Sequence, residues 1–212
     1  MITYREATKE EIPYIAKLST LSFGNFPFFD FAFLDCFKEA SAYFKYMDKL
    51  HLVHLRANMT KHKCFVGIQN NKIISVALLQ DPTCKRISVL DYIQACGISL
   101  IYPVGFIKIL DFLELSEKAH QDCSEKYRTS WYLEMLAVNP TMKGCGLGSA
   151  MLKDCVIPFI QKQGGKELTL ITNTEQNCKF YTKNGFYKFA ERALDYKNQK
   201  INNWSFVMNV RD

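Results

Sequence analysis

Apolar and polar positions switch between strand-like and helix-like spacing along the N-terminal part of the chain. Residues 2–7 form a short β-rich run, and Thr8-Lys9-Glu10-Glu11 follows as a capping box before apolar residues at helical spacing. The runs 64–68 and 73–80 have strand character, and the turn between them contains two asparagines, which tolerate left-handed backbone angles. The pattern predicts a strand, a helix and a β-hairpin.

Two further segments are rich in apolar side chains. Residues 23–46 carry so many phenylalanines and tyrosines that we expect core, pocket wall or both, with plain core packing favoured for most rings. Residues 82–128 have a mixed helical pattern. Its apolar positions are Ile107, Leu110, Leu113 and Leu115, with a polar stretch at residues 116–128.

The C-terminal half alternates strands and helices. The predicted elements are a strand at 131–138, a glycine-rich turn at 143–149, a helix that ends at Gln163-Gly164-Gly165, a strand at 168–172, a helix at 175–183, a strand from 186 to about 193, a polar turn at 195–200 and a strand at 204–210. This order predicts an α/β sheet in which 131–138 and 168–172 are neighbours.

Composition narrows the class of protein. At 212 residues, 48% hydrophobic and 23% charged, the chain suits one globular domain. The net charge of +6 is scattered, which favours an ordinary surface with one phosphate site over a nucleic-acid partner. The most apolar stretch, residues 98–110, is interrupted by Pro103, Gly105 and Lys108 and is too short for a membrane span.

Cysteine and histidine usage points to a reducing compartment and away from metal binding. The eight cysteines are spread along the chain with no C-x-x-C spacing, and no signal peptide is evident, so we expect reduced thiols and a cytoplasmic location. His51 and His54 are one helical turn apart, but the histidines offer no complete ligand set. No metal is expected.

The glycine-rich turn is the strongest chemical signal. A strand that leads through several glycines into a helix lets bare main-chain N–H groups converge on an anion, at the positive end of the helix dipole. Two common phosphate loops do not fit. Gly148 is followed by Ser149-Ala150 where a P-loop needs Lys-Ser or Lys-Thr, and Ser149 also stands where the dinucleotide fingerprint needs its third glycine.

Three linked motifs resemble the GNAT superfamily of N-acetyltransferases. Lys143-Gly144-Cys145-Gly146-Leu147-Gly148 is similar to its acetyl-CoA signature, Leu136-Ala137-Val138-Asn139-Pro140 to the strand and turn before it, and residues 177–186 to its later helix, which ends in Phe-Tyr and Gly-Phe. The entry Trp131-Tyr132-Leu133 resembles puromycin N-acetyltransferase and its small-molecule relatives. Cys145 departs from the basic residue often found there, and Lys143 or Lys153 could supply the missing charge.

The resemblance implies one GNAT domain over residues 1–212, with an acceptor-side part at 1–128 and a cofactor-binding part at 129–212. The implied fold is a mixed central sheet of about six or seven strands flanked by helices, with strands 131–138 and 168–172 splayed around acetyl-CoA. The residues implied to contact the cofactor are Leu136, Ala137, Val138, Lys143, Gly144, Cys145, Gly146, Leu147, Gly148, Ser149, Asn177 and Tyr181.

Acetyl transfer to an amine needs an oxyanion donor, an acid for the leaving thiolate and a base for the amine. The resemblance implies the Val138 N–H for the first role and Tyr181 for the second, since a phenol with a pKa of about 10 stays protonated at neutral pH. Glu134 is the best candidate base, because strand alternation places it on the face of Leu136 and Val138. The alternative for Glu134 is a surface glutamate paired with a lysine, and the resemblance then implies a water chain or a remote carboxylate as the base.

We expect direct transfer in a ternary complex to the primary amine of a small molecule, by a monomer or homodimer. The aromatic segment 23–46 suggests an apolar or aromatic amine, and Trp131 and Tyr132 are expected near it, although strand aromatics are more often core. A protein or peptide N-acetyltransferase and a non-catalytic CoA-binding regulatory module remain as alternatives.

Overall fold

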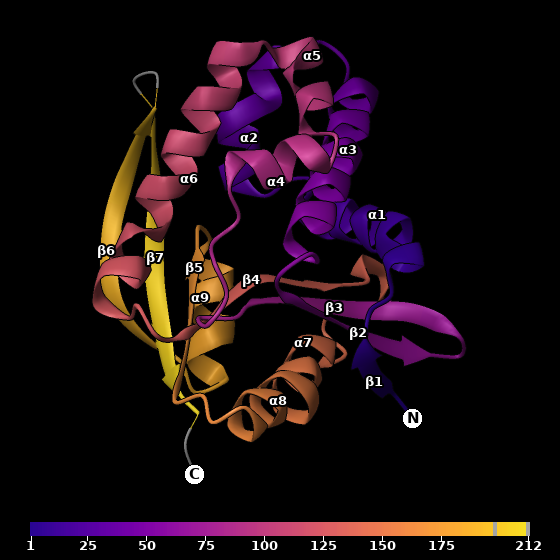
Figure 1. The fold of residues 1–212 in the computed structure, drawn as a ribbon, viewed down its shortest axis with the longest axis vertical. Coiled ribbons are helices and arrows are strands. Elements are labelled where there is room, and N and C mark those ends of the chain that lie inside the picture. The colour runs from indigo at the N-terminus through magenta and orange to yellow at the C-terminus, as the bar shows by residue number, and fades with distance from the viewer. Residues whose placement is uncertain (197–198, 211–212) are drawn as a thin grey trace.

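A seven-stranded mixed sheet forms the centre of the computed structural model, which describes residues 1–196 and 199–210 (Figure 1). The strands lie in the order β1-β2-β3-β4-β5-β7-β6, with β4 and β5 parallel and the other neighbours antiparallel. They are β1 (Thr3–Glu6), β2 (Lys63–Gln69), β3 (Lys72–Gln80), β4 (Trp131–Val138), β5 (Glu167–Thr172), β6 (Tyr187–Tyr196) and β7 (Gln199–Asn209). The predicted α/β fold and its strand number are confirmed.

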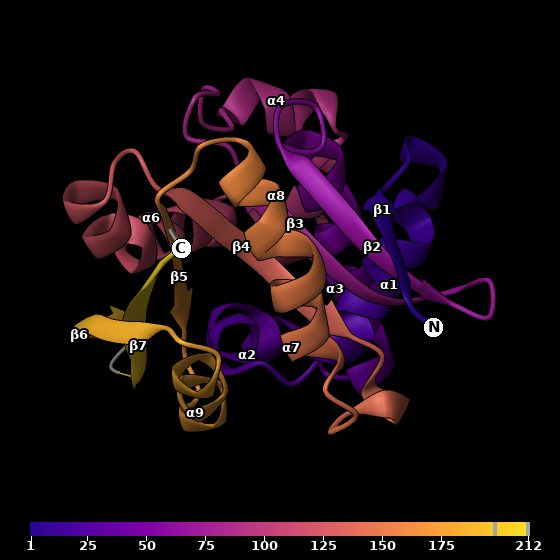
Figure 2. The ribbon, with the colours of Figure 1, turned by 90° about the horizontal axis from the view of Figure 1, so that it is seen from below.

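Helices cover both faces of the sheet (Figures 1 and 2). On one face lie α1 (Ile12–Phe23), α2 (Pro27–Phe33), α3 (Ala40–Asn58), α4 (Val89–Gln94), α5 (Ile101–Val104) and α6 (Phe106–Lys126). On the other lie α7 (Leu147–Met151), a π-helical turn (Leu152–Val156), α8 (Ile157–Lys162) and α9 (Glu175–Lys183). Short 3₁₀ turns occur at Lys9–Glu11, Leu34–Cys36, Gly97–Leu100 and Pro140–Met142. Among the described residues, no helix has both the length and the hydropathy to cross a bilayer.

The β2–β3 hairpin has the predicted turn. Asn70 and Asn71 adopt φ angles of 51° and 57°, and Gln69 pairs with Lys72 across the two-residue loop. Two successive left-handed residues define a turn whose twist matches that of the flanking strands. The asparagine pair therefore fixes the register that brings β3 alongside β4.

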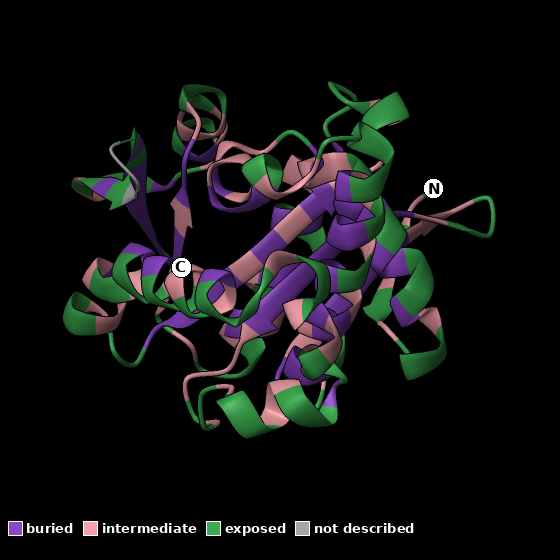
Figure 3. Cartoon of the chain, turned by 90° about the horizontal axis from the view of Figure 1, so that it is seen from above, coloured by how far each residue is buried: buried purple, intermediate pink, exposed green. Residues whose placement is uncertain are grey.

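Three clusters of buried side chains hold the layers together. One packs α7, α8 and α9 against β4, β5 and β7, a second packs α2, α3 and α6 together and against β6 and β7, and a third packs α1 and α3 on β2, β3 and β4. The middle strands are largely buried, and the helices expose their outer surfaces (Figure 3). β4 contributes to the first and third clusters, so the strand is fixed from both faces.

The aromatic segment 23–46 is mainly core, as favoured from its composition. Phe33 is fully buried and its ring lies 4.7 Å from that of Phe112 on α6 and 5.1 Å from that of Tyr46 on α3. Phe23 and Phe29 remain only partly buried beside the buried imidazole of His51. Tilted and edge-to-face aromatic contacts of this kind pack three helices into one layer.

The apolar positions of the 82–128 segment do not form the buried face of its helix. Ile107, Leu110 and Leu113 are exposed, and of the four positions only Leu115 is buried. Helix α6 instead buries Lys108, Leu115, Ala119 and Cys123, and the partly buried Phe112 completes this stripe at four- and three-residue spacing. Lys108 fits this stripe because its ammonium group lies 2.7 Å from the Asp35 carboxylate, while its stem packs under the helix.

The C-terminal strands are longer than predicted. β6 continues to Tyr196 and β7 begins at Gln199, so Asp195 and Lys200 are paired strand residues and not part of a turn. Residues 197–198, also within the predicted turn, lie outside the described residues. The long antiparallel pairing of β6 with β7 and of β7 with β5 completes one edge of the sheet.

β4 and β5 pair over a very short distance. Only the pairs Trp131–Leu168 and Tyr132–Thr169 are in register, although β4 continues to Val138 and β5 to Thr172. Beyond these pairs the two parallel strands separate while each stays paired on its other side, β4 with β3 and β5 with β7. The predicted splayed strand pair is therefore confirmed.

Truncating Leu170 tests whether the cluster around β5 holds the splayed sheet together. Leu170 is buried between β5 and the α7–α8 layer, so Leu170→Ala should lower the free energy of unfolding by about 2–5 kcal/mol. The control Leu21→Ala removes the same atoms from an exposed position of α1 and should change the free energy of unfolding by less than about 0.5 kcal/mol. Urea denaturation compares the two, and equal effects would contradict this account of the core.

Candidate functional site

The edge of β4 that faces β5 presents main-chain groups without strand partners. The Asn139 N–H donates to the Ile74 carbonyl at 2.8 Å, just beyond the Ser75–Val138 pair. In an antiparallel ladder such a pair does not exchange hydrogen bonds itself, so the main chain of Val138 points away from β3. The same alternation turns the main chain of Leu136 toward β5. Because β5 has already diverged, both N–H groups face the opening between the strands.

The turn after β4 relies on glycine for its backbone. Gly144 and Gly146 adopt φ angles of +87° and +76°, in the left-handed region that side chains rarely occupy. A Cβ atom at either position would meet no other atom within 4 Å, so the space above both glycines is open. Lys143, Gly144, Cys145 and Gly146 are all exposed. The turn therefore brings bare backbone to the surface, as a phosphate loop requires.

Free N–H groups follow at the start of the helix. In residues 1–196 and 199–210, no acceptor is found for the main-chain N–H groups of Leu147, Gly148 and Ser149, whereas that of Ala150 reaches the Gly146 carbonyl at 2.9 Å. α7, the π-helical turn and α8 continue one another with helical angles at each junction, so the helix dipole extends from Leu147 to Lys162. These amides suit a diphosphate.

Gly148 serves a different purpose from the two glycines before it. A Cβ atom there would lie 3.0 Å from Cζ of Phe180 and 3.9 Å from a methyl group of Leu136. Only a hydrogen atom leaves room for α9 to pack against the first turn of α7. This contact joins the glycine turn, β4 and α9 into one unit and sets the position of Tyr181, the residue after Phe180.

Tyr181 lies in the cluster beneath the sheet. Its ring centroid is 5.1 Å from that of Phe180, 5.4 Å from that of Phe186 and 6.2 Å from that of Phe206. Burial raises the pKa of the Tyr181 phenol above its ordinary value, so the hydroxyl stays protonated over the working pH range. The predicted acid is thus held rigidly in its proton-donating form.

A β-bulge changes the predicted orientation of Glu134. Leu78 pairs with Met135 and Leu79 with Leu133, so Glu134 is the extra residue on β4. Leu136 packs with the α7–α8 cluster, but Glu134 contacts α3 and α6 on the opposite face. The prediction that Glu134 shares the face of Leu136 is therefore wrong, because strand alternation does not continue through a bulge.

The Glu134 carboxylate is enclosed by three side chains from different elements. Oε1 lies 3.1 Å from Nε2 of His54 on α3, and Oε2 lies 3.5 Å from Nε2 of His120 on α6. Gln80 of β3 donates its Nε2–H to Oε2 at 2.8 Å. With 13% of its side chain exposed, Glu134 is not the lysine-paired surface glutamate considered as the alternative.

The imidazoles decide the charge of Glu134. Burial by itself would raise the pKa of this carboxyl group, but the contacts with His120 and His54 outweigh burial and leave the pKa below its ordinary value. Burial would likewise lower the pKa of His120, and its contact with Glu134 raises it overall. Glu134 is therefore an anion, and its neighbours stabilise it as one.

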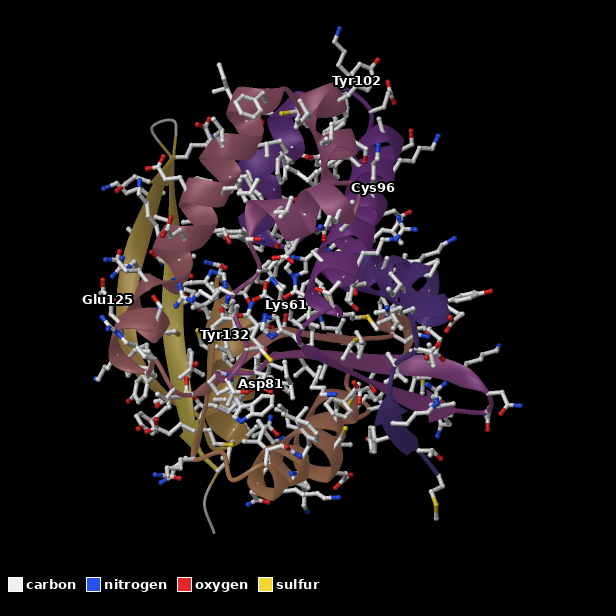
Figure 4. All side chains as sticks on the ribbon, viewed as in Figure 1. Lys61, Asp81, Cys96, Tyr102, Glu125 and Tyr132 are labelled. Atoms are coloured by element: carbon white, nitrogen blue, oxygen red, sulfur yellow. The ribbon has the colours of Figure 1, made fainter. Side chains whose placement is uncertain are left out.

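Tyr132 lies between the place where β4 and β5 separate and the Glu134 network, which consists of Glu134, His54, His120 and Gln80. Its ring centroid is 4.9 Å from that of His120, and burial followed by the nearby Glu134 carboxylate raises the pKa of the Tyr132 phenol. Figure 4 shows Tyr132 between the sheet and the helical layer above it. Trp131, also expected near the acceptor, packs on Phe159 in the core.

The remaining candidate residues surround the turn and the strand edge. Ala137 is buried under α1, so only its main chain can meet a ligand. Asn177 is half-buried in the first turn of α9, where its N–H donates to the Thr174 hydroxyl. Lys153 is exposed on the π-helical turn, five residues after Gly148. These three candidates therefore come from β4, the π-helical turn and α9.

Sequence reasoning missed the polar partners of Glu134. His54, His120 and Gln80 come from α3, α6 and β3, and Tyr92 of α4 joins them through His54, with 3.0 Å between the tyrosine hydroxyl and Nδ1. The spacing of His51 and His54 was visible, but nothing local links either to residue 134. In the described part of the chain, no group of three His, Cys, Asp or Glu side chains could hold a metal ion.

Comparison with protein families decides the assignment. The family model for the acetyltransferase (GNAT) domain matches residues 101–188, which include the splayed strands, the glycine turn and α9. Residues 101–188 are therefore similar to a GNAT acetyltransferase domain. This confirms the resemblance drawn from the three motifs, and with it an acyltransferase that uses acetyl-CoA. No curated protein sequence matches the chain.

Solved GNAT structures share the whole fold at low sequence identity. An agmatine N-acetyltransferase variant matches with a TM-score of 0.62 at 13% identity, over 98% of this chain and 99% of that one. The ribosomal-protein-S18-alanine N-acetyltransferase from Escherichia coli matches with a TM-score of 0.57 at 14% identity, over 100% and 96%. At such identities the likeness establishes the fold of this protein and leaves its acceptor open.

Alanine substitutions at two glycines with the same backbone conformation can distinguish an effect on CoA binding from an effect on stability. Gly146 and Gly164 both have positive φ and open space at Cβ, but Gly164 follows α8, at the opposite end of the helix from the glycine turn. Alanine at either position should cost roughly 1–2 kcal/mol of folding free energy. Only Gly146→Ala should also weaken CoA binding, by about tenfold or more in calorimetry, because its methyl group enters the phosphate site. Equal CoA affinities for the two variants would show that the glycine turn does not bind CoA.

Proposed function

We propose that this protein transfers the acetyl group of acetyl-CoA to a primary amine of a small molecule, with both substrates bound at once. The observation that carries the proposal is the opening between β4 and β5, which has the glycine turn and Tyr181 on one face and Glu134 on the other. An enclosed carboxylate suits a small amine better than a protein side chain. We place the protein in the cytoplasm, where acetyl-CoA is available.

The residues present fit acetyl-CoA. The N–H groups from Leu147 to Ser149, with the open backbone of Gly144 and Gly146, would hold the diphosphate, and Lys143 adds charge at the rim. The N–H groups of Leu136 and Val138 would pair with the pantetheine amides, and the half-buried Asn177 side chain in the first turn of α9 would assist. When bound, acetyl-CoA supplies an acetyl thioester, which is the acyl donor.

Each chemical requirement falls to a different part of the site. The Val138 N–H is available as a donor to the carbonyl oxygen that gains charge, because it points away from β3 and toward the opening. Tyr181 holds the proton that a leaving thiolate needs. Glu134 and its imidazole partners receive the acceptor from the α3–α6 side. A direct path for the amine nitrogen through the opening would make a covalent enzyme intermediate unnecessary.

A panel of acetyl acceptors tests the function. Thiol release from acetyl-CoA should appear with small primary amines, above all apolar or aromatic ones, and not with peptides. Faster release with peptide N-termini or lysine peptides would support a protein acetyltransferase instead. A rise in Tm with CoA but no thiol release with any amine would indicate a binding module without catalysis.

Removing the Tyr181 hydroxyl should separate catalysis from binding. Tyr181→Phe keeps the ring contacts in the core, so we expect kcat to fall roughly 10²–10⁴-fold while the Kd of CoA is unchanged. Tyr187→Phe, which removes an exposed hydroxyl from β6, is the matched control and should leave both values unaltered. An unchanged kcat in Tyr181→Phe would end the assignment of this residue as the acid.

A further inference from the structure

The hydrogen-bond partners of His54 select the tautomer of its neutral imidazole. Its Nε2 faces the Glu134 carboxylate at 3.1 Å, and an ionised carboxylate can only accept, so Nε2 carries hydrogen. Its Nδ1 lies 3.0 Å from the Tyr92 hydroxyl, which can donate to it. A neutral imidazole with hydrogen on Nε2 therefore satisfies both neighbours. The Asn58 side chain, which donates to the His54 carbonyl at 2.9 Å, further restrains this turn of α3.

His120 has the opposite arrangement. Its Nδ1 lies 2.6 Å from the Ser116 carbonyl, which can only accept, so Nδ1 carries hydrogen in every state. The nitrogen that gains and loses a proton is then Nε2, which faces Oε2 of Glu134 at 3.5 Å. In the neutral state a lone pair points toward an anion, and in the protonated state the two groups form an ion pair. Glu134 thus increases the basicity of this one nitrogen.

Other charged and titratable groups near this pair do not reverse that effect. Arg86 opposes protonation of His120, but burial and Arg86 together are outweighed by Glu134 and the Ser116 carbonyl, so the pKa of His120 is raised. Tyr132 contacts the His120 ring and remains a neutral phenol. His62, a third imidazole near Glu134, uses Nδ1 to accept from the Asp81 N–H, and burial lowers its pKa. His120 is therefore the proton-accepting group of the network.

We propose that Nε2 of His120 takes the proton from the acceptor's ammonium group, and that Glu134 stays ionised as the positioning residue for both imidazoles. The inference rests on the proposed amine acetylation and revises which group in the site is the base. An N–H bond of the ammonium breaks, a bond from hydrogen to Nε2 forms, and the electron pair remains on the amine nitrogen as the nucleophile. The imidazolium pairs with Glu134 and later releases its proton to water through its exposed part.

An NMR titration of the imidazole nitrogens in the protein without substrates tests the electrostatic half of this proposal. His120 should titrate above the ordinary value of about 6.5 and show hydrogen on Nδ1 when neutral, while neutral His54 should show hydrogen on Nε2. In Glu134→Gln the His120 midpoint should fall, since burial and Arg86 remain. A midpoint at or below about 6.5, or one that is the same in Glu134→Gln, would overturn the proposal.

Kinetics test the catalytic half. Wild-type kcat/KM should rise with pH through the His120 midpoint, because only neutral His120 accepts a proton. His120→Asn keeps a donor for the Ser116 carbonyl but lacks Nε2. In this variant the rise of kcat/KM with pH should disappear and kcat/KM should fall roughly 10²–10⁴-fold, while CoA affinity is unchanged. His120→Gln, which lacks the fixed Nδ1 bond, provides a second variant, and circular dichroism verifies that both are folded.

The control His54→Gln keeps a donor toward Glu134 and should retain the pH limb. A wild-type limb that persists in folded His120→Asn and His120→Gln would refute the role of His120 while leaving amine acetylation intact. If the wild-type protein acetylates no amine, the proposed function fails, and the NMR midpoints still decide whether Glu134 makes His120 the basic group.

Discussion

The pairing of β4 with β5 ends after two residue pairs, and the organisation of the site depends on that early end. A strand that remained paired would spend its N–H groups on its neighbour, and those of Leu136 and Val138 would be unavailable to any ligand. The strands can separate because each is secured elsewhere, β4 by β3 and β5 by β7, with buried clusters on both faces. The bulge at Glu134 adds local twist at the point where they diverge.

The same opening divides the chemistry between two faces of the sheet. Groups suited to an acyl-CoA lie beneath it, on a helix start and on α9, and they are linked by the close approach of Phe180 to Gly148. Groups suited to an amine lie above it, where a buried carboxylate is surrounded by imidazoles from α3 and α6. A carboxylate so stabilised is a poor proton acceptor but a strong influence on its neighbours, which is why the base is sought among the histidines.

Features that depend on local sequence could be predicted. The glycine turn, the Asn70-Asn71 hairpin and the position of Tyr181 on α9 follow from residues close together in the chain, and the splayed strand pair followed from the family resemblance. The face of Glu134 could not be predicted, because a bulge requires the register of β3 against β4. The buried stripe of α6 was missed because one of its members is Lys108, whose partner Asp35 lies far away in the sequence.

The histidine network is the clearest case of information that only the fold holds. His54 and His120 belong to helices separated by the β2–β3 hairpin, and they meet at Glu134 because both helices cover the same end of β4. The groups that would recognise the amine therefore come largely from the first 126 residues, whereas those that would hold the donor come from residues 136–181. Because the two sets lie in different parts of the chain, a substitution in one set leaves most of the other in place, so recognition of the acceptor and binding of the donor can change separately.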